Sequence, residues 1–337
     1  MAPLPVLAAA AAIAPIVLSV AQRLPLRIGL ALVYHRIAPR PGDRRRELVP
    51  AMGLELFERQ LRFVAQELRP VKASELWEAI HVRRRGEALP VAITFDDDWA
   101  SHLEHAAPAL EREGVPATFF LCGASLDKPR FFWWELLQHA VDSGVDAAAV
   151  LGVPNPNAAI HTLGGLFEYT EAHRREQLEH RLSEAAGTPP RTGMGRNDIQ
   201  ALHAKGFEIG FHTLRHHRLP DLSDTELRRA VSDGRQELEE IAGRMKVISY
   251  PHGAADARVA EAASAAQFEL GYWTDVAAVT PATAQHLLGR LEPSTRSTRA
   301  LELQIALALL AAIGRRVTAV ARTRARPARR TDPYRAA

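Results

Sequence analysis

The sequence predicts an α/β fold built around a parallel β-sheet. Short apolar runs that resemble buried strands alternate with segments of helical spacing, which is typical of βαβ units. Polar clusters directly follow several of the predicted strands, and the carboxyl ends of parallel strands are where barrel proteins build active sites. The chain has 337 residues, 47% of them hydrophobic, so it is long enough to bury a large core.

Six short apolar runs are predicted to be buried strands, because polar or turn-forming residues bound them. They cover residues 28–34, 90–95, 117–121, 207–211, 247–250 and 270–273. The segments between them place apolar residues at helical spacing, or are bounded by helix-capping residues. The predicted helices cover residues 54–68, 75 onward, 103–113, 199–205, 222–241, 258–266 and 301–313.

Capping residues support several of these helix boundaries. Ser74 is placed to cap the helix that begins at Glu75, and Ser223 and Glu226 have the spacing of a capping box. A glycine, which adopts the left-handed conformation without strain, follows the helices at 103–113 and 199–205.

Residues 123–190 break the alternation of strands and helices. The segment contains Trp133–Trp134, two glycine-containing links and the sequence Pro154–Asn155–Pro156. We expect it to form an insertion with several helices, within a main domain that covers residues 28–300.

The apolar segment at residues 1–27 allows three interpretations. Ala2 to Val20 contains no charged residue, and Ser19–Val20–Ala21 could form the cleavage site of a signal peptide. The segment could also be a membrane anchor, and Arg23 and Arg27 would then leave the rest of the chain in the cytoplasm. The third interpretation is a helix packed on the domain. Membrane association or a cytoplasmic location is favoured over secretion.

The positive charge is concentrated at the other end, in residues 301–337. Eight arginines and one acidic residue lie between Arg315 and the end, so this tail carries a charge of +7 (8 − 1) and the rest of the chain −4 (3 − 7), which together give the net charge of +3. The remaining chain is mildly acidic, and the high pI therefore does not indicate nucleic-acid binding. A basic stretch beside an apolar helix could lie on an anionic membrane surface, or it could be a packing helix followed by a solvated tail.

Two adjacent acids and a pair of histidines predict a metal centre. Asp96 and Asp97 follow the strand at 90–95, and charged side chains rarely end a buried strand without a partner. His212 and His216 are four apart, so on a helical turn their imidazoles could share a metal, with Asp97 as the third ligand. Asp98 is expected to cap the following helix. Cys122, the only cysteine, is expected to be a core residue rather than a nucleophile.

These residues resemble the motifs of the polysaccharide deacetylases, the NodB-homology or carbohydrate esterase family 4 domain. Thr94–Asp97 and His212–His216 are similar to the first two motifs of that family. Further similar segments lie at residues 34–36, 117–121, 249–253 and 288–291, so the resemblance spans about residues 28–295.

The resemblance implies a distorted (β/α) barrel with one divalent ion, usually zinc. By motif position, Asp97, His212 and His216 would be its ligands, and Asp96 the general base that takes a proton from the attacking water. A backbone N–H near His252 would help the metal to stabilise the oxyanion. The implied reaction removes acetyl groups, N-acetyl rather than O-acetyl, from a carbohydrate or glycolipid.

The sequence departs from the family pattern at three positions. Asp98 stands where the family has a glycine after the acid pair, His217 where it has a proline after the second histidine, and His252 where it has the tyrosine of a Pro-Tyr pair. The last two changes put additional imidazoles near the site. The family's late histidine has no counterpart in its usual context, so His252 and His286 are the candidates for the acid that protonates the leaving group. His35 is expected to be structural or to lie at the rim.

Substrate contacts are expected from Trp99, which adjoins the acid pair, and from Arg290 in the late strand segment. Trp133, Trp134 and Trp273 are also able to stack on sugars, but core packing is the more common role of a tryptophan. Two other functions remain open: hydrolysis of a non-carbohydrate amide at the same site, and glycan binding by a catalytically decayed barrel.

Overall fold

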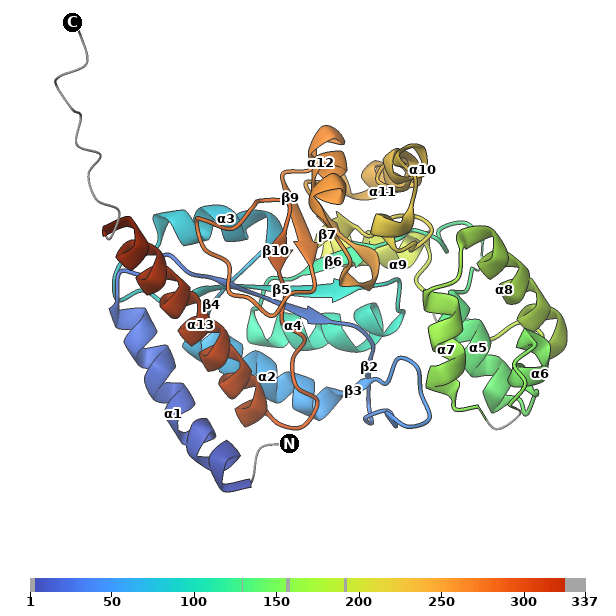
Figure 1. Cartoon of the computed structure of the whole chain (residues 1–337), viewed down its shortest axis with the longest axis horizontal. Helices are drawn as coiled ribbons and strands as arrows, with labels where there is room; N and C mark the ends of the chain where they lie inside the picture. Colours follow the sequence, from blue (N-terminus) through green and yellow to red (C-terminus); the bar gives the residue numbers. More distant parts are fainter. Residues whose placement is uncertain (1–3, 129, 156–157, 191–192, 325–337) are drawn as a thin grey trace, which may run out of the picture.

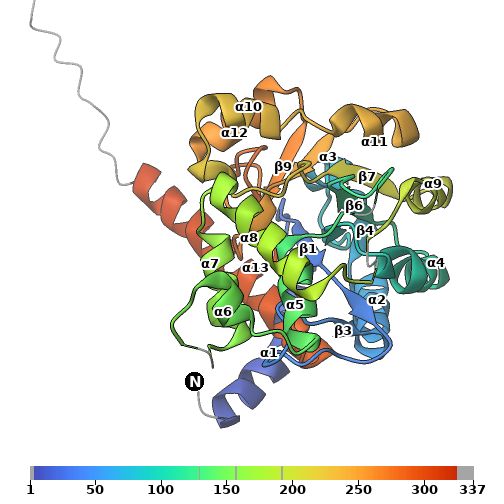
Figure 2. The same ribbon diagram turned by 90° about the vertical axis from the view of Figure 1, so that its right-hand side faces the viewer.

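The chain folds around a parallel sheet that curves into an almost closed barrel (Figures 1 and 2). The computed structural model describes all residues except 1–3, 129, 156–157, 191–192 and 325–337. The strands of the main sheet are β1 (Leu30–Tyr34), β4 (Arg69–Val71), β5 (Pro90–Asp96), β6 (Thr118–Leu121), β7 (Glu208–Phe211), β8 (Val247–Ser249), β9 (Leu270–Trp273) and β10 (Leu288–Gly289). A separate pair, β2 (Ile37–Ala38) and β3 (Met52–Gly53), follows β1.

The strand order is β1-β5-β6-β7-β8-β9-β10, with β4 paired to the first half of β5, and these pairings are all parallel. Just after β10, Leu291 returns to β1. Its backbone N–H donates to Ala31 O at 2.8 Å, and its carbonyl accepts from Val33 N at 3.0 Å. These bonds bring the two ends of the sheet together, which confirms the expected distorted barrel.

Helices surround the sheet and carry the chain from one strand to the next. They are α1 (Leu4–Arg23), α2 (Leu54–Glu67), α3 (Ala73–Val82), α4 (Ala107–Glu113), α5 (Trp133–Asp142), α6 (Ala147–Leu151), α7 (Ile160–Glu168), α8 (Ala172–Ala186), α9 (Arg196–Ala204), α10 (Asp224–Ala230), α11 (Arg235–Ala242), α12 (Ala257–Ala265) and α13 (Thr298–Arg324). Helix α1 packs along α13, and α13 also contacts α2. Among the described residues, no helix is both long and apolar enough to cross a membrane.

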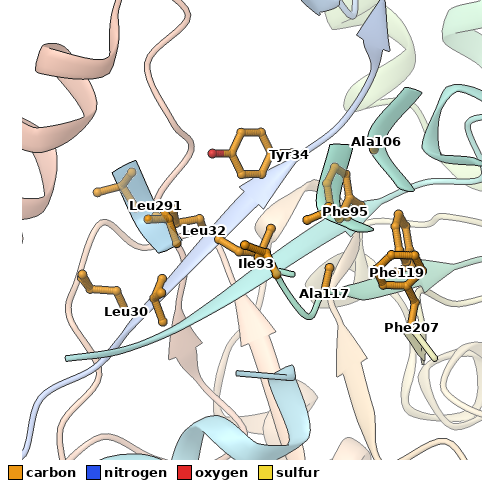
Figure 3. Packing of buried hydrophobic residues seen from close by; sticks show 14 of the residues in the cluster. Leu30, Leu32, Tyr34, Ile93, Phe95, Ala106, Ala117, Phe119, Phe207 and Leu291 are labelled. Atoms are coloured by element: carbon orange, nitrogen blue, oxygen red, sulfur yellow. The ribbon is translucent and has the colours of Figure 1, made fainter. Parts of the chain in front are cut away.

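The core joins the sheet to the helices through a row of aromatic side chains (Figure 3). The Phe95 ring of β5 stacks on Tyr34 of β1, with centroids 5.6 Å apart, and on Phe119 of β6, with centroids 4.7 Å apart. All three side chains are almost fully buried. Stacked aromatic contacts add to the energy of burial, so this row stabilises the packing of three neighbouring strands.

Several predicted helix boundaries were wrong. Ser74 does not cap α3: the helix begins two residues earlier than predicted, at Ala73, and the N-cap is Lys72, whose backbone N–H donates to Glu75 Oε2. The single helix predicted for residues 222–241 is two, because Gly234 adopts a left-handed φ of 78° between α10 and α11. Ser223 does cap α10, as expected.

The helix predicted for residues 301–313 is longer, since α13 continues to Arg324. Alanine and arginine are good helix formers, so the beginning of the arginine run extends the helix instead of ending it. The remainder of the predicted tail, residues 325–337, lies outside the described residues.

Four helices, α5 to α8, lie between β6 and α9 in the segment predicted as an insertion. Their buried residues, among them Leu137, Leu163, Phe167 and Leu182, form a hydrophobic cluster separate from the main core. In Figure 1 this group stands beside the barrel, next to the end toward which β1 and β5 point.

Candidate active site

A cavity of about 500 Å³ opens at the carboxyl ends of the strands. Side chains at or just after the ends of β5, β7 and β8 line one side, and the helices α5 and α7 contribute another. Its polar and aromatic lining includes Asp96, Asp97, Trp133, Trp134, Glu168, His212, His216 and His252. The cavity therefore unites groups from distant parts of the sequence.

Asp97, His212 and His216 converge at the floor of this cavity. Asp97 Oδ1 lies 3.5 Å from His212 Nε2 and 3.3 Å from His216 Nε2, and all three side chains are buried. The histidine pair is not on a helix, contrary to expectation. It lies in the loop after β7, where Thr213 and His216 have positive φ angles of 60° and 49°. The loop brings the imidazoles together by a tight turn instead.

The backbone around these groups is strained. In the described part of the chain five non-glycine residues have positive φ, and four of them are Asp97, Thr213, His216 and His252. Non-glycine residues rarely adopt this conformation, and such strain collects at functional sites. The surrounding structure holds these four residues in backbone conformations that orient their side chains as a relaxed backbone would not.

The protonation of the three groups suits a cation. His212 Nδ1 lies 2.9 Å from the Ser249 carbonyl, which can only accept, so Nδ1 is the nitrogen that donates there and Nε2 is the nitrogen left free to ligate a cation beside Asp97. Burial would raise the pKa of Asp97, but its contacts with His212 and His216 outweigh burial and hold the pKa well below the usual range. The carboxyl group is therefore ionised.

These donors fit a divalent metal ion. Apart from the two imidazoles, Asp97 Oδ1 has no hydrogen-bond partner among the described residues, although it is buried. A buried carboxylate oxygen without a donor is costly, and a cation between the three ligand atoms would satisfy it. Two imidazoles and one carboxylate, with room left in the cavity, are a common donor set for catalytic zinc.

Asp96 turns away from this centre into a buried hydrogen-bond network. Arg290 Nη1 donates to Oδ1 at 2.7 Å and Nη2 to Oδ2 at 2.6 Å, and Ser249 Oγ donates to Oδ2 at 3.0 Å. Burial would raise the pKa of Asp96, but the charges of Arg290 and His212 lower it to about 2. Asp96 is thus an ionised carboxylate, with Oδ2 3.8 Å from His212 Nε2.

The position of Arg290 contradicts its predicted contact with substrate. Its side chain is 1% exposed, it does not line the cavity, and its guanidinium is occupied by Asp96, Ser249 and Thr94. Arg290 therefore acts on Asp96. Sequence reasoning missed Ser249 and Thr94. The available signal was an arginine between the apolar residues of the 288–291 segment, because a buried guanidinium requires a carboxylate and further acceptors.

Asp98 was expected to cap the following helix, but it does not. Its carboxylate accepts from the backbone N–H groups of Cys122 at 2.8 Å and Ala124 at 3.0 Å, in the turn that follows β6. Burial raises its pKa to about 6 despite these bonds. Asp98 thus ties the ends of β5 and β6 together below the site. Cys122 is fully buried, consistent with the core role predicted for it.

Of the two predicted proton donors, only His252 lines the cavity. Its ring centroid is 4.7 Å from that of His216, and its Nδ1 is 3.9 Å from Glu168 Oε1 of α7. Its Nε2 is buried without a hydrogen-bond partner in the described residues. Burial, then the nearby His216, lower the pKa of His252 to about 2. Sequence reasoning did not identify Glu168, because nothing in the neighbouring sequence distinguishes it from the other glutamates of the chain.

His286 lies at the opposite end of the barrel. It precedes β10, and its Nε2 is 2.8 Å from the carbonyl of Phe268, which precedes β9. The amino ends of these strands are remote from the cavity at their carboxyl ends. The prediction that His286 is a proton donor is therefore wrong.

The two remaining histidines that the sequence analysis named, His35 and His217, lie in different places. His35 lines the cavity, as a rim residue would, and its carbonyl lies 3.2 Å from His102 Nε2. His217 faces a second hollow between α8 and α10, with Glu176 and Arg229, so it does not add an imidazole to the centre.

Trp99 is not a wall of the cavity, contrary to expectation. It is 7% exposed and absent from the lining, and Arg36 lies over its ring at 5.5 Å from the centroid. Trp133 and Trp134 of α5 line the cavity instead. Trp134 meets His216 edge-on at 4.8 Å between centroids, and Trp133 stacks on Phe167 at 5.2 Å.

Comparison with known proteins assigns the chain to a family. The sequence profile of the polysaccharide deacetylase family matches residues 83–150 and 157–271, just over half of the chain. No curated protein sequence matches the chain.

Several solved structures share the fold. The Streptococcus pyogenes deacetylase PplD in complex with acetate aligns with a TM-score of 0.57 at 16% identity, over 82% of this chain and 97% of that one. BC0361, a polysaccharide deacetylase from Bacillus cereus, aligns with a TM-score of 0.55 at 16% identity, over 84% of this chain and 69% of that one. IcaB from Ammonifex degensii aligns with a TM-score of 0.54 at 18% identity, over 83% of this chain and 96% of that one.

The matched profile includes Asp96, Asp97, His212, His216 and His252, the residues that converge at the cavity. The chain belongs to the polysaccharide deacetylase family, whose members are hydrolases that act on carbon–nitrogen bonds other than peptide bonds.

Proposed function

We propose that this protein is a metal-dependent deacetylase that removes N-acetyl groups from a carbohydrate or glycolipid. The observation that carries the proposal is the buried Asp97 carboxylate, which faces His212 and His216 at 3.5 and 3.3 Å and has no other hydrogen-bond partner in the described chain. The separately buried Asp96 beside it supplies a base.

Asp97, His212 and His216 would hold one divalent ion, and their donor set suits zinc. When bound, the ion supplies Lewis-acid chemistry, because it lowers the pKa of a water molecule and polarises the acetyl carbonyl. The Ser249 carbonyl keeps His212 in the tautomer that ligation requires.

Asp96 would take a proton from the attacking water. Arg290 and Ser249 hold its carboxylate in one orientation, and its low pKa keeps it ionised before the reaction. Removing rotational freedom from the base in advance lowers the entropic part of the barrier.

The proton taken from water must finally reach the leaving amine nitrogen. His252 lines the cavity and is the donor we propose for this transfer. Because its low pKa makes the ring neutral in the free protein, it has to receive a proton before it can give one. The backbone N–H of His252 is proposed to stabilise the oxyanion.

The cavity suits a carbohydrate ring. Trp133 and Trp134 offer aromatic edges and faces, while Glu168, Arg36 and Arg44 add polar groups in the same lining. Apolar faces with a few polar groups are the usual means by which a pocket orients a small polar ligand.

The proposal is tested by measuring the metal content of the purified chain and acetate release from N-acetylated glucosamine oligomers, O-acetylated glycans and N-acetylated peptides. We expect about one divalent ion per chain, and acetate from the N-acetylated oligomers. Acetate from the peptides alone would indicate a different amide substrate. Absence of both metal and acetate would overturn the proposal.

A further inference from the structure

Helix α13 keeps an apolar face in solvent. From Leu303 to Gly314 its one polar side chain is Gln304, and this residue is used internally: it accepts from Ser294 N at 2.9 Å and donates to Glu292 O at 3.1 Å. Leu307 and Leu310 are nevertheless 56% and 48% exposed. A helix that is apolar on all sides is normally covered.

Helix α1 beside it has the same property. Ala14, Leu18 and Ala21 are buried, whereas Ile13 and Ile16 are 53% and 62% exposed. Val20, one turn further on, is 47% exposed. We call Ile13, Ile16, Val20, Leu307 and Leu310 the two-helix face. These five are among the large exposed hydrophobic side chains of the described chain, and they lie on two helices in contact.

Positive charge adjoins this face. Arg23 and Arg27 follow its last apolar residue on α1, Arg315 follows on α13, and all three are exposed. Figure 1 shows the two helices running in the same general direction, so their carboxyl-terminal ends lie toward the same end of the pair. In the sequence, seven more arginines and one acid follow Arg315.

We propose that the two-helix face docks on the surface of an anionic lipid bilayer. Its apolar side chains would enter the boundary between headgroups and acyl chains, and the arginines would pair with anionic headgroups. Apolar area and basic charge act together in interfacial binding, because each alone holds a protein only weakly at a membrane. The charge next to the face is what favours a lipid surface over another apolar partner.

The test is sedimentation of the full chain with vesicles of phosphatidylcholine, with and without phosphatidylglycerol. We expect binding to the vesicles that contain phosphatidylglycerol and weaker binding as salt is added. The double variant Ile16→Ser with Leu307→Ser should lower the partition coefficient by about tenfold or more, because it removes two exposed apolar side chains.

A matched control is the double variant Val82→Ser with Val276→Ser. These valines are 55% and 63% exposed, similar to Ile16 and Leu307, but lie on α3 and in the loop after β9. The control should bind vesicles as the unaltered chain does. Thermal unfolding of both variants shows whether each remains folded. Replacing Arg322, Arg324, Arg329 and Arg330 by glutamine should weaken vesicle binding and make the remaining binding less sensitive to the salt concentration.

Three outcomes would overturn the proposal: no sedimentation with any vesicle, equal loss of binding in the control and the Ile16/Leu307 variant, or a dimer by light scattering that the Ile16/Leu307 variant converts to a monomer. The last would identify a second copy of this chain as the occupant of the face.

Discussion

Asp96 and Asp97 are adjacent in the chain, but their side chains meet different surroundings. The positive φ of Asp97, 70°, turns its carboxylate toward the two histidines, whereas Asp96 is still within β5 and points to Arg290. Among the described residues, Asp97 Oδ1 therefore has no hydrogen-bond donors other than the imidazoles, whereas Asp96 accepts three strong hydrogen bonds. This difference is why we assign Asp97 as a metal ligand and Asp96 as the base.

We expect Asp97→Ala to lose both bound metal and activity, whereas Asp96→Asn keeps the metal. The asparagine is nearly isosteric but cannot take a proton, so kcat should fall by about 10²- to 10⁴-fold. Metal content and acetate release, measured on the same preparations, check this. Full activity of Asp96→Asn would show that another group is the base.

Arg290 is predicted to matter for stability as well as turnover. Arg290→Gln leaves the buried Asp96 carboxylate without its cation, which should destabilise the fold by about 3 to 5 kcal/mol. Urea unfolding measures this, with Arg196→Gln as the control. Arg196 pairs with Asp127 at the surface, where water screens the two charges, so this variant should lose far less stability. Similar losses in both variants would contradict the role assigned to Arg290.

At the scale of elements, the helices α5 and α7 determine the width of the site. Trp133 and Trp134 come from the first turn of α5, while Gly164 and Glu168 come from α7. A Cβ on Gly164 would lie 2.7 Å from Leu48 and 3.6 Å from Trp133, so the glycine lets the two helices and the 48–50 segment approach closely.

Trp133→Ala should raise KM by about tenfold with little change in metal content or kcat, because it removes an aromatic surface and not a reacting group. Steady-state kinetics on an N-acetylated oligomer tests this. Leu166→Ala, an exposed position on α7 outside the cavity lining, is the control and should leave KM unchanged. An unchanged KM in Trp133→Ala would place the sugar elsewhere.

At the scale of the whole molecule, the proposed metal joins distant strands. Its ligands follow β5 and β7, which β6 separates in the sheet. A ligand that binds only the folded chain stabilises it by about 2.7 kcal/mol at a concentration one hundred times its Kd.

Removal of the metal with a chelator should therefore lower Tm by about 5 °C. Differential scanning calorimetry before and after chelation, and after zinc is restored, measures the shift. Asp97→Ala should show no such shift. A Tm of the unaltered chain that chelation does not change would contradict a metal at this site.

The sequence by itself determined six strands of the parallel sheet and the polar residues that follow their carboxyl ends, but not the short strands β2, β3 and β4. This was possible because buried strands are continuous apolar runs and because polar residues that end them must meet at one edge. Asp96, Asp97, His212, His216 and His252 were all singled out in this way, and all five line the cavity.

Only the tertiary structure decided which side chains line the same cavity and which are neighbours in the sequence alone. Trp99 is next to the acid pair along the chain yet lies behind it, while Trp133 and Glu168 arrive from the inserted helices. His286 and Arg290 are four residues apart but lie at opposite ends of a two-residue strand. Direction along a strand and the packing of non-adjacent helices are long-range properties, so local pattern could not reveal them.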